Sequence, residues 1–475
     1  MRKLIGAVVG IAMAAGAGLW APRAAAESLA DALISAYRSS NLLEQNRALL
    51  RVRDEDVARA VSTLRPVIDF VVRSNWSNSE QRVPAPTATN PLATRVTSPE
   101  NLTTTLSITA EITLWDAGAN RYGIGAAQEI ALATRQALVG IENRVLLLAV
   151  QSYLNVRLAR DTVALQESNV RVLERQLTAA RDRFDLGEIT RTDVAIAESR
   201  LAAARAALAR AQGDLAVERE AFRVAVGRYP GQLREPPRAP ATARSLEEAR
   251  SIAVRTHHRI KQLQHQVAAD ELNVLRAEAA MRPRVTASAN YGINDSGLQQ
   301  RSVGIGLSQR LYQGGALSAQ MRQAIASRDA TRAQLHQAVA EVERDVAQAW
   351  ARRDVARASI TATDRQIAAA RAALEGVTEE AKLGARTTLE VLDAEQELLE
   401  ARAQRLSAVT QEYLATYALL DAMGLLTVDH LRLGIPTYDV SAYYNAVKSA
   451  PSTPSLQGQK LDRVLRAIGG GDSRR

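Results

Sequence analysis

Hydrophobic and polar positions alternate with a period of two in four short segments of the chain. Residues 102–114 carry mostly Leu, Ile and Ala at one parity and mainly Thr and Ser at the other. Residues 285–293 and 303–311 repeat this pattern, and residues 67–76 follow it less regularly. Because successive side chains of a strand point to opposite faces, the pattern predicts four strands, each with one apolar face.

Two long segments, residues 117–183 and 316–382, contain very few helix breakers and many regularly spaced Leu, Val and Ala residues. At 1.5 Å per residue, each would form a helix roughly 100 Å long. A helix of that length cannot be accommodated in a compact domain, so we expect it to pack along neighbouring helices through a coiled-coil-like apolar seam.

The chain contains an internal repeat. Residues 184–194 (FDLGEITRTDV) correspond to residues 381–391 (AKLGARTTLEV), 197 positions later, and Trp115 corresponds to Tyr312 at the same offset. Earlier in each half the offset is 217, as between Pro66 and Pro283. The first half therefore carries 20 additional residues, which we place in a proline-containing loop between its two strands.

Each half is predicted to have the same order of elements. A helix of about 35 residues (28–64 or 245–281) comes first, and an Arg-Pro pair ends it because proline cannot continue the helix. A strand pair, a long helical region, a glycine-containing turn and a closing helix follow. The predicted organisation is a signal peptide at 1–26, a first repeat at 27–227 with its hairpin at about 66–115, a Pro-rich linker at 228–243, a second repeat at 244–424 with its hairpin at about 283–312, and a partly disordered C-terminal tail at 425–475.

The N-terminus has the pattern of a secretory signal peptide. Arg2 and Lys3 precede an apolar run over residues 4–20, and three alanines end at Ala26, so we expect cleavage before Glu27. A retained membrane anchor is the alternative. After residue 26 no uninterrupted apolar run reaches about 18 residues, so no transmembrane helix is expected. An exported chain without such a helix is periplasmic, secreted or an outer-membrane barrel.

Composition excludes several classes of function. The sequence has no cysteine, which rules out a disulfide framework, a thiolate metal site and a lipoprotein anchor. The formal net charge is +9, but Arg alternates with Asp and Glu along the helices, so we expect solvated helix faces and no nucleic-acid partner. The five histidines lack metal-ligand spacing, and no nucleophile elbow or phosphate-binding loop is present. We therefore expect no enzyme activity, cofactor or metal.

The small number of strands predicts oligomerisation. Four strands, each about ten residues long, match the thickness of a bilayer but cannot close on themselves, and open edges would leave backbone groups unpaired in lipid. Two protomers would form a filled eight-stranded barrel, whereas three would form a twelve-stranded barrel with a lumen. If the function is passage, the strand count favours a homotrimer. The expected fold class is mainly α with a small β part.

These features resemble the TolC-like outer-membrane efflux protein family. The resemblance spans about residues 27–425 and is carried by the signal peptide, the duplicated helix–hairpin–long-helix order, and the two Leu-Gly motifs beginning at Leu186 and Leu383. It implies a trimeric exit duct with a twelve-stranded transmembrane β barrel in outer-membrane lipid and a long periplasmic α-helical barrel. It also implies tripartite drug efflux, type I protein secretion or both, with an inner-membrane transporter and a periplasmic adaptor protein as partners.

The resemblance also suggests site residues at a periplasmic tip that opens and closes. Glu390 and Asp393 would form acidic rings around the pore aperture, and Arg386 would pair with Asp193, helped by Thr192, to keep the tip closed. A trimer would bring six carboxylates to one axis, because positions three apart share a helical face, and such rings attract cations.

Two observations leave this assignment open. The acids stand at the start of a predicted helix, where they could simply stabilise the positive end of the helix dipole. Ala381 replaces a tyrosine that assists closure in the family, so the closed state could be held by other residues. For the whole chain, the alternatives are a periplasmic coiled-coil adaptor, which the duplicated strand pairs disfavour, and a surface rod, which would have no use for acidic rings.

Overall fold

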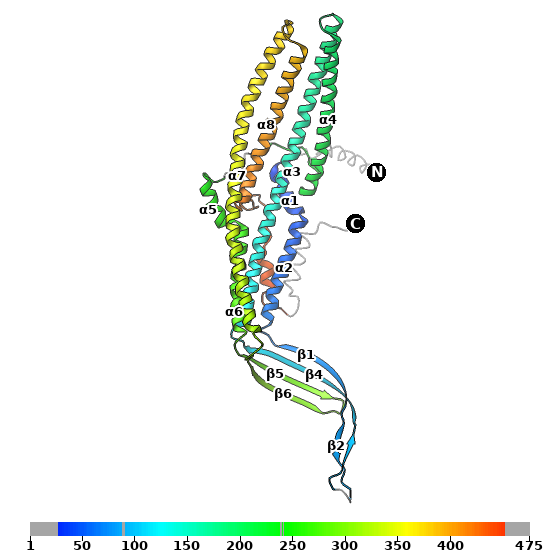
Figure 1. Cartoon of the computed structure of the whole chain (residues 1–475), viewed down its shortest axis with the longest axis vertical. Coiled ribbons are helices and arrows are strands. Elements are labelled where there is room, and N and C mark those ends of the chain that lie inside the picture. Colours follow the sequence, from blue (N-terminus) through cyan, green and yellow to red (C-terminus); the bar gives the residue numbers. More distant parts are fainter. Residues whose placement is uncertain (1–26, 88–90, 238–239, 241, 452–475) are drawn as a thin grey trace, which may run out of the picture. The chain divides into compact units, whose positions relative to one another are not determined.

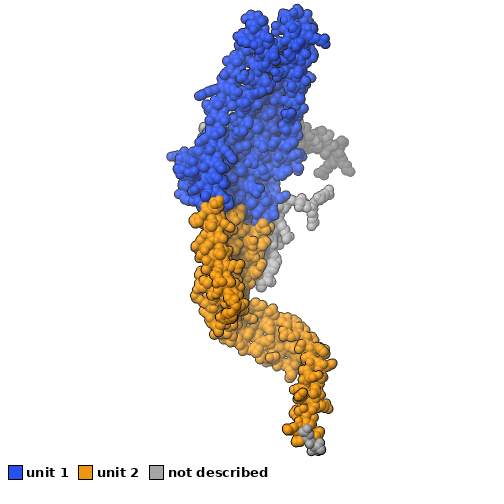
Figure 2. Space-filling view, in the orientation of Figure 1, with its two compact units in different colours: residues 1–46, 138–260, 338–438 blue, residues 47–137, 261–337, 439–475 orange. Residues whose placement is uncertain are grey.

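The computed structural model describes residues 27–87, 91–237, 240 and 242–451. The predicted signal peptide and the glycine-rich C-terminal end lie outside these residues. The chain is mostly helical with a small sheet part, as predicted. It divides into two compact units (Figure 2), and each unit draws on both halves of the sequence. Unit 1 comprises residues 1–46, 138–260 and 338–438, and unit 2 comprises residues 47–137, 261–337 and 439–475.

The first helix of each half is broken, which corrects the prediction of single helices over 28–64 and 245–281. The structure has α1 (Leu29–Ser39), α2 (Asn41–Ser62), α5 (Leu246–Thr256) and α6 (His258–Ala279). Ser40 and His257 adopt extended backbone conformations at the breaks. The Leu43 N–H donates to the Ser40 hydroxyl, and the Arg259 N–H donates to the His257 ring. These local bonds compete with continuation of the helix.

The long helices have the predicted length. Helix α3 (Ala119–Asp185) and helix α7 (Ala316–Lys382) each span 67 residues (Figure 1). They are followed by α4 (Arg191–Val226) and α8 (Thr388–Ala422). Contrary to the expectation from the sequence, α3 is long enough and, in an 18-residue window of mean hydropathy 1.2, apolar enough to cross a membrane. Half of that window is buried within the protein, as in the core helix of a soluble protein, so length and hydropathy do not by themselves identify α3 as a transmembrane helix.

The predicted strands form one antiparallel sheet in the order β1-β4-β5-β6. Its strands are β1 (Val67–Asn78), β4 (Glu100–Trp115), β5 (Arg284–Asn294) and β6 (Gln299–Ser308). Pairing of β4 with β5 joins the two predicted hairpins into a single sheet. One row of directly paired residues, Ile68, Ala110, Ala289 and Val303, crosses all four strands. Because paired residues lie on the same face, the apolar positions of the four strands are in register.

That face of the sheet is exposed in the single chain. On β6, side chains alternate between large apolar residues and small Gly or Ser residues, and Val303 is 88% exposed. Exposed large apolar residues also lie on this face on β1 and β4: Ile68, Phe70, Val72, Trp76, Leu102, Leu106, Ile108 and Leu114. Exposed apolar area on this scale marks a surface that is covered in the working protein.

The segment between β1 and β4 contains more structure than the proline-containing loop predicted between the two strands. Strands β2 (Gln81–Pro84) and β3 (Thr94–Thr97) pair with each other in a separate two-stranded sheet. Prolines led us to expect only loop structure, but Pro84 lies in β2, an edge strand of a two-stranded sheet, where a missing N–H is tolerated.

The C-terminal tail contains a short helix that the sequence did not predict, α9 (Val440–Val447), which begins after the N-cap residue Asp439. In unit 2, the Tyr443 hydroxyl donates to Glu55 at 2.7 Å, and the Arg135 guanidinium lies 4.9 Å from the centre of the Tyr444 ring. Arg65 also donates to the backbone carbonyls of Ser449 and Ala450. The tail tyrosines therefore fix this segment on helices α2 and α3.

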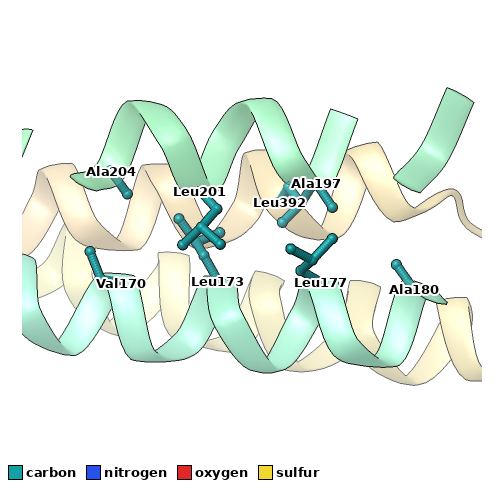
Figure 3. Close-up of a cluster of buried hydrophobic side chains, with 8 residues drawn as sticks. All are labelled: Val170, Leu173, Leu177, Ala180, Ala197, Leu201, Ala204 and Leu392. Carbon is teal, nitrogen blue, oxygen red and sulfur yellow. The ribbon is translucent and has the colours of Figure 1, made fainter. Parts of the chain in front are cut away.

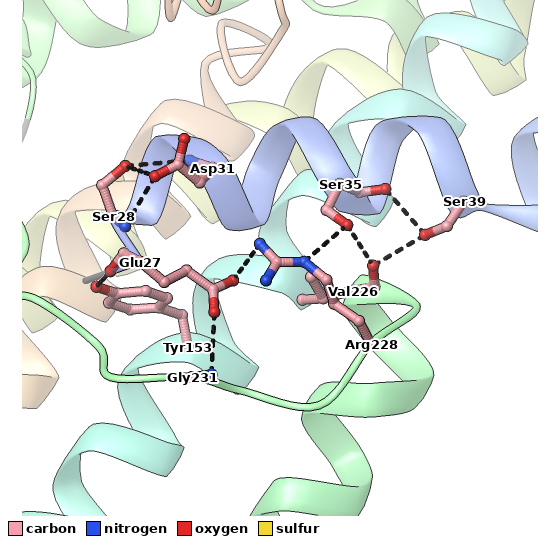
Figure 4. Close-up of polar contacts among 9 residues, drawn as sticks. All are labelled: Glu27, Ser28, Asp31, Ser35, Ser39, Tyr153, Val226, Arg228 and Gly231. Atoms are coloured by element: carbon pink, nitrogen blue, oxygen red, sulfur yellow. Dashed lines mark hydrogen bonds and ion pairs between the residues drawn. The ribbon is translucent and has the colours of Figure 1, made fainter. Parts of the chain in front are cut away.

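The first described residue is firmly held within unit 1 (Figure 4). The Glu27 N–H donates to the Gln232 carbonyl at 2.7 Å, and the Arg234 N–H donates to the Glu27 carbonyl at 2.9 Å. The buried Tyr153 hydroxyl donates to the carbonyls of Glu27 and Arg234, and burial raises the pKa of Tyr153 to about 12. The Glu27 carboxylate pairs with Arg228 at 2.7 Å. These contacts attach the start of α1 to the segment that follows α4.

Candidate functional site

Helix pairs α3–α4 and α7–α8 are each joined by the same tight turn. At the first turn, the Gly187 N–H donates to the Phe184 carbonyl and the Glu188 N–H donates to the Arg183 carbonyl. The second turn, around Gly384, repeats both bonds at the equivalent positions. This pair of hydrogen bonds defines a Schellman motif, which requires a residue in the left-handed backbone conformation directly after the helix. Both glycines supply it, with φ of 77° and 75°.

The helix after each turn begins with a capping box. Thr190 caps α4 and Thr387 caps α8, with Asp193 and Glu390 as the acids three residues later. Each threonine hydroxyl accepts the backbone N–H of its acid, and each carboxylate accepts the backbone N–H of its threonine. The Thr190 hydroxyl and backbone N–H, both donating to Asp193, hold the pKa of that carboxyl group below its usual range. The Thr387 backbone N–H and the Arg386 guanidinium do the same for Glu390. The repeated motif Leu-Gly-x-x-Thr-x-x-acid is therefore explained by the geometry of the turns.

The structure gives Arg386 different partners from the one that the sequence suggested. Its guanidinium donates to Glu380 at 2.7 Å and to Glu390 at 2.8 Å, and these carboxylates raise its pKa. Asp193 is engaged by Thr190 within its own capping box. Thr192 is exposed in the first turn of α4. Within one chain, Arg386 and Asp193 are thus each bonded within their own turn region, and their pairing remains a prediction about the assembly.

Asp393 has a partner that the sequence did not reveal. Arg200, on α4, donates to the Asp393 carboxylate at 2.7 Å. Two residues further along α8, the Glu395 carboxylate accepts a bond from Gln176 on α3 at 3.1 Å, and burial raises the pKa of Glu395. Both contacts connect the α7–α8 pair to the α3–α4 pair. They depend on the spatial register of two distant segments, for which a single sequence carries no signal.

An apolar contact lies next to these polar ones. Leu392 of α8 is 2% exposed and packs into a cluster formed by side chains of α3 and α4 (Figure 3). The cluster consists of Val170, Leu173, Leu177, Ala180, Ala197, Leu201, Ala204 and Leu392. Leu392 is the only member from α8 among the described residues of this cluster, so within the cluster it is the apolar contact between the two helix pairs.

The chemistry available at these turns is electrostatic. In the described part of the chain, no group of three or more His, Cys, Asp or Glu residues is arranged to hold a metal ion. The exposed groups are carboxylates and guanidiniums at the ends of long helices. Such an arrangement can attract or repel ions and can form or break ion pairs with a neighbouring chain.

Comparison with known proteins identifies the class. The family described as "Outer membrane efflux protein" matches residues 33–228 and 250–425. The chain therefore belongs to the outer membrane efflux protein family, which confirms the predicted family and its outer-membrane location. The members of this family are channel proteins, not enzymes.

Individual relatives agree with this assignment. The chain is 33% identical over 454 residues to the outer membrane efflux protein BepC of Brucella suis, covering 94% of this chain and 95% of BepC. It is 28% identical to the alkaline protease secretion protein AprF of Pseudomonas aeruginosa, covering 63% of this chain and 65% of AprF. The crystal structure of CusC has the same fold, with a TM-score of 0.74 at 18% identity, covering 84% of this chain and 92% of CusC.

Proposed function

We propose that this chain is one protomer of a homotrimeric exit duct in the outer membrane. The duct would serve drug efflux, type I protein secretion or both, together with an inner-membrane transporter and a periplasmic adaptor protein. Membership of the outer membrane efflux protein family supports this proposal. Efflux is the activity in the name of BepC, and protease secretion is that in the name of AprF, so the relatives favour both cargo classes.

The observation that carries the proposal is the open four-stranded sheet. Strands β1 and β6 are its two edges, and its apolar face is exposed in the single chain. An open edge in hydrocarbon leaves N–H and C=O groups unpaired, at a cost of several kcal/mol for each group. Pairing β6 of one protomer with β1 of the next would remove both edges, and three copies would close a twelve-stranded barrel with a lumen. Small residues such as Gly304 and Gly306 would then face the interior, opposite the apolar face.

The two capped turns support a gate at the periplasmic tip. Glu390 and Asp393 would form the acidic rings of the aperture, and the tip would close when Arg386 pairs with Asp193 and Thr192 of a neighbouring helix pair. Arg386 is well suited to such a switch, because its present partners Glu380 and Glu390 are exposed carboxylates. Exchanging one exposed ion pair for another costs little free energy.

Membrane extraction and conductance together test the proposal. The protein should resist carbonate extraction, purify in detergent with the mass of three chains, and produce ion conductance in planar bilayers. A periplasmic adaptor, the alternative function, would be released by carbonate and would not conduct. A water-soluble monomer would contradict the proposal.

A further inference from the structure

Both acids assigned to the aperture have an arginine partner within their own chain. Glu390 accepts a bond from Arg386 at 2.8 Å, and Asp393 accepts one from Arg200 at 2.7 Å. The two arginines come from different places: Arg386 belongs to the turn that precedes α8, whereas Arg200 belongs to α4 of the other helix pair. Each of the two acids therefore has a guanidinium beside it, but Arg386 is shared with Glu380, whereas the bond of Arg200 to Asp393 involves no second carboxylate.

We propose that Arg200 is a selectivity-determining residue of the channel, because its ion pair with Asp393 compensates the charge of one acidic ring at the aperture. This inference rests on the proposed function, which places Asp393 at the aperture. In a trimer, three Arg200 guanidiniums would offset three Asp393 carboxylates. The attraction of the aperture for cations is then weaker than a count of its acids alone would indicate.

The position of Arg200 is set by packing. Leu392, directly before Asp393, is buried among side chains of α3 and α4, including Ala197 and Leu201 on either side of Arg200. The buried leucine holds the first turns of α8 against α4. The backbones of Arg200 and Asp393 therefore stay close to each other, and their side chains can pair. The bond from Gln176 to Glu395 holds the next turn of α8 against α3.

Solvent exposure determines how the pair acts. The Arg200 and Asp393 side chains are 42% and 56% exposed, so both charges face water and permeating ions can sense them. An exposed pair adds little to stability. Its effect on ions should be large at low salt and should fade as ionic strength shortens the Debye length from about 30 Å at 0.01 M to about 3 Å at 1 M.

Substitution of Arg200 tests this proposal in the trimeric channel. Arg200→Gln removes the guanidinium but keeps a polar side chain. Arg205→Gln is the matched control, since Arg205 lies on the same helix and pairs with Glu174 at 2.9 Å, away from the assigned rings. Both variants lose one positive charge per chain. Reversal potentials in a KCl gradient and the concentration of hexaamminecobalt(III) that blocks half of the current are measured for both.

We expect Arg200→Gln to increase cation preference in KCl by roughly two- to fivefold at low salt, the scale of one exposed unit charge a few ångströms away in water. The half-blocking concentration should fall by a larger factor, because the blocker carries three positive charges. Arg205→Gln, five residues further along α4, should have a clearly smaller effect. Adding Asp393→Asn to Arg200→Gln should return both quantities to the wild-type range.

Two results would overturn the proposal. The first is that Arg200→Gln and Arg205→Gln change selectivity and block equally, and the second is that Asp393→Asn leaves the effect of Arg200→Gln intact. Both leave the channel function standing, because the wild-type protein still conducts. If the wild-type trimer itself does not conduct, it is the proposed function that fails, and the inference fails with it.

Discussion

Truncation of Leu392 should loosen the junction between the two helix pairs. Its side chain is 2% exposed and inserts from α8 among side chains of α3 and α4. Leu392→Ala removes this contact but leaves the ion pair of Asp393 chemically intact. If the closed tip depends on α8 lying against α4, the variant should spend more time open.

The magnitude follows from the burial. Replacing a fully buried leucine by alanine costs about 2–5 kcal/mol, from lost transfer free energy and the residual cavity. If the contact exists only in the closed tip, the whole cost falls on that state, and each 1.4 kcal/mol changes the ratio of open to closed tips about tenfold. The ratio of open to closed tips should therefore increase by roughly 30-fold to a few thousandfold, which is an upper estimate because it assigns the whole cost to the closed state.

Single-channel recording in planar bilayers measures this ratio directly. Leu389→Ala is the matched control, because Leu389 lies in the first turn of the same helix but is 39% exposed. Its truncation should change the open fraction little. Equal behaviour of the Leu389 and Leu392 variants would refute the reasoning, and so would an unchanged conductance in a Leu392 variant whose trimer is measurably less stable.

Three further predictions concern single positions. Burial raises the pKa of Asp54, which is 1% exposed, from 3.8 to about 6. The folded protein therefore binds the Asp54 proton more tightly than the unfolded chain does. The resulting contribution to the free energy of unfolding is fully present below about pH 4 and is lost as the pH rises through 6. Asp54→Asn should therefore gain stability relative to wild type between pH 4 and pH 7, by up to about 3 kcal/mol in denaturant unfolding. Gly384→Ala should destabilise by roughly 1 kcal/mol because of its φ of 75°, whereas Gly376→Ala, inside α7 with open space around it, should stabilise by about 0.5–1 kcal/mol. Arg386→Gln should raise single-channel conductance if Arg386 closes the tip, whereas Lys382→Gln, which removes only the nearby pair with Glu379, should not.

Each of these has a result that would contradict it. A pH-independent difference between Asp54→Asn and wild type would mean that the carboxyl group titrates normally in the folded protein. Stabilisation by Gly384→Ala would mean that the turn relaxes out of the left-handed region. Equal conductance changes in the Arg386 and Lys382 variants would mean that the loss of any positive charge near the turn raises conductance, and that Arg386 does not specifically close the tip.

The sequence predicted the regular elements well, because their signals are local. Helix α7 occupies residues 316–382 as expected, since few breakers interrupt that segment. Helix α3 starts two residues later than predicted, because Ala117 and Gly118 both have positive φ, which no helix accommodates. Strands β4 and β5 follow from the alternation of apolar and polar side chains. Strand β6 covers residues 299–308 rather than the predicted 303–311, and its first four residues are all polar, so alternation carries no signal for them.

The misses have physical causes. Ser40 and His257 are acceptable inside helices, and only their side-chain bonds to later backbone N–H groups reveal the breaks. Helix α9 is eight residues long, too short for a periodic pattern to be recognised, and it is held by contacts to other helices. Its N-cap Asp439 was an available local signal.

The candidate site was predicted only in part. Glu390 and Asp393 were singled out as acids on one helical face, and the Thr-x-x-acid spacing at Thr387 carried the additional signal of a capping box. The ion pair of Asp393 with Arg200 joins residues 193 positions apart, and it depends on how the two helix pairs are aligned along each other. Neither hydrophobic period nor motif spacing determines that alignment.

The attachment of Glu27 has a consequence for the order in which the protein folds. The Glu27 carboxylate accepts a bond from the Gly231 N–H, 204 positions later, and helix α1 bonds through Ser35 and Ser39 to the Val226 carbonyl. Glu27 and helix α1 therefore cannot make these contacts until nearly half of the polypeptide has been synthesised. Contacts between such distant segments form slowly, because the entropy of closing a large loop must be lost first. During that interval the apolar face of α1 and the unclosed apolar strands remain uncovered, and transiently exposed surface of this kind is prone to aggregation.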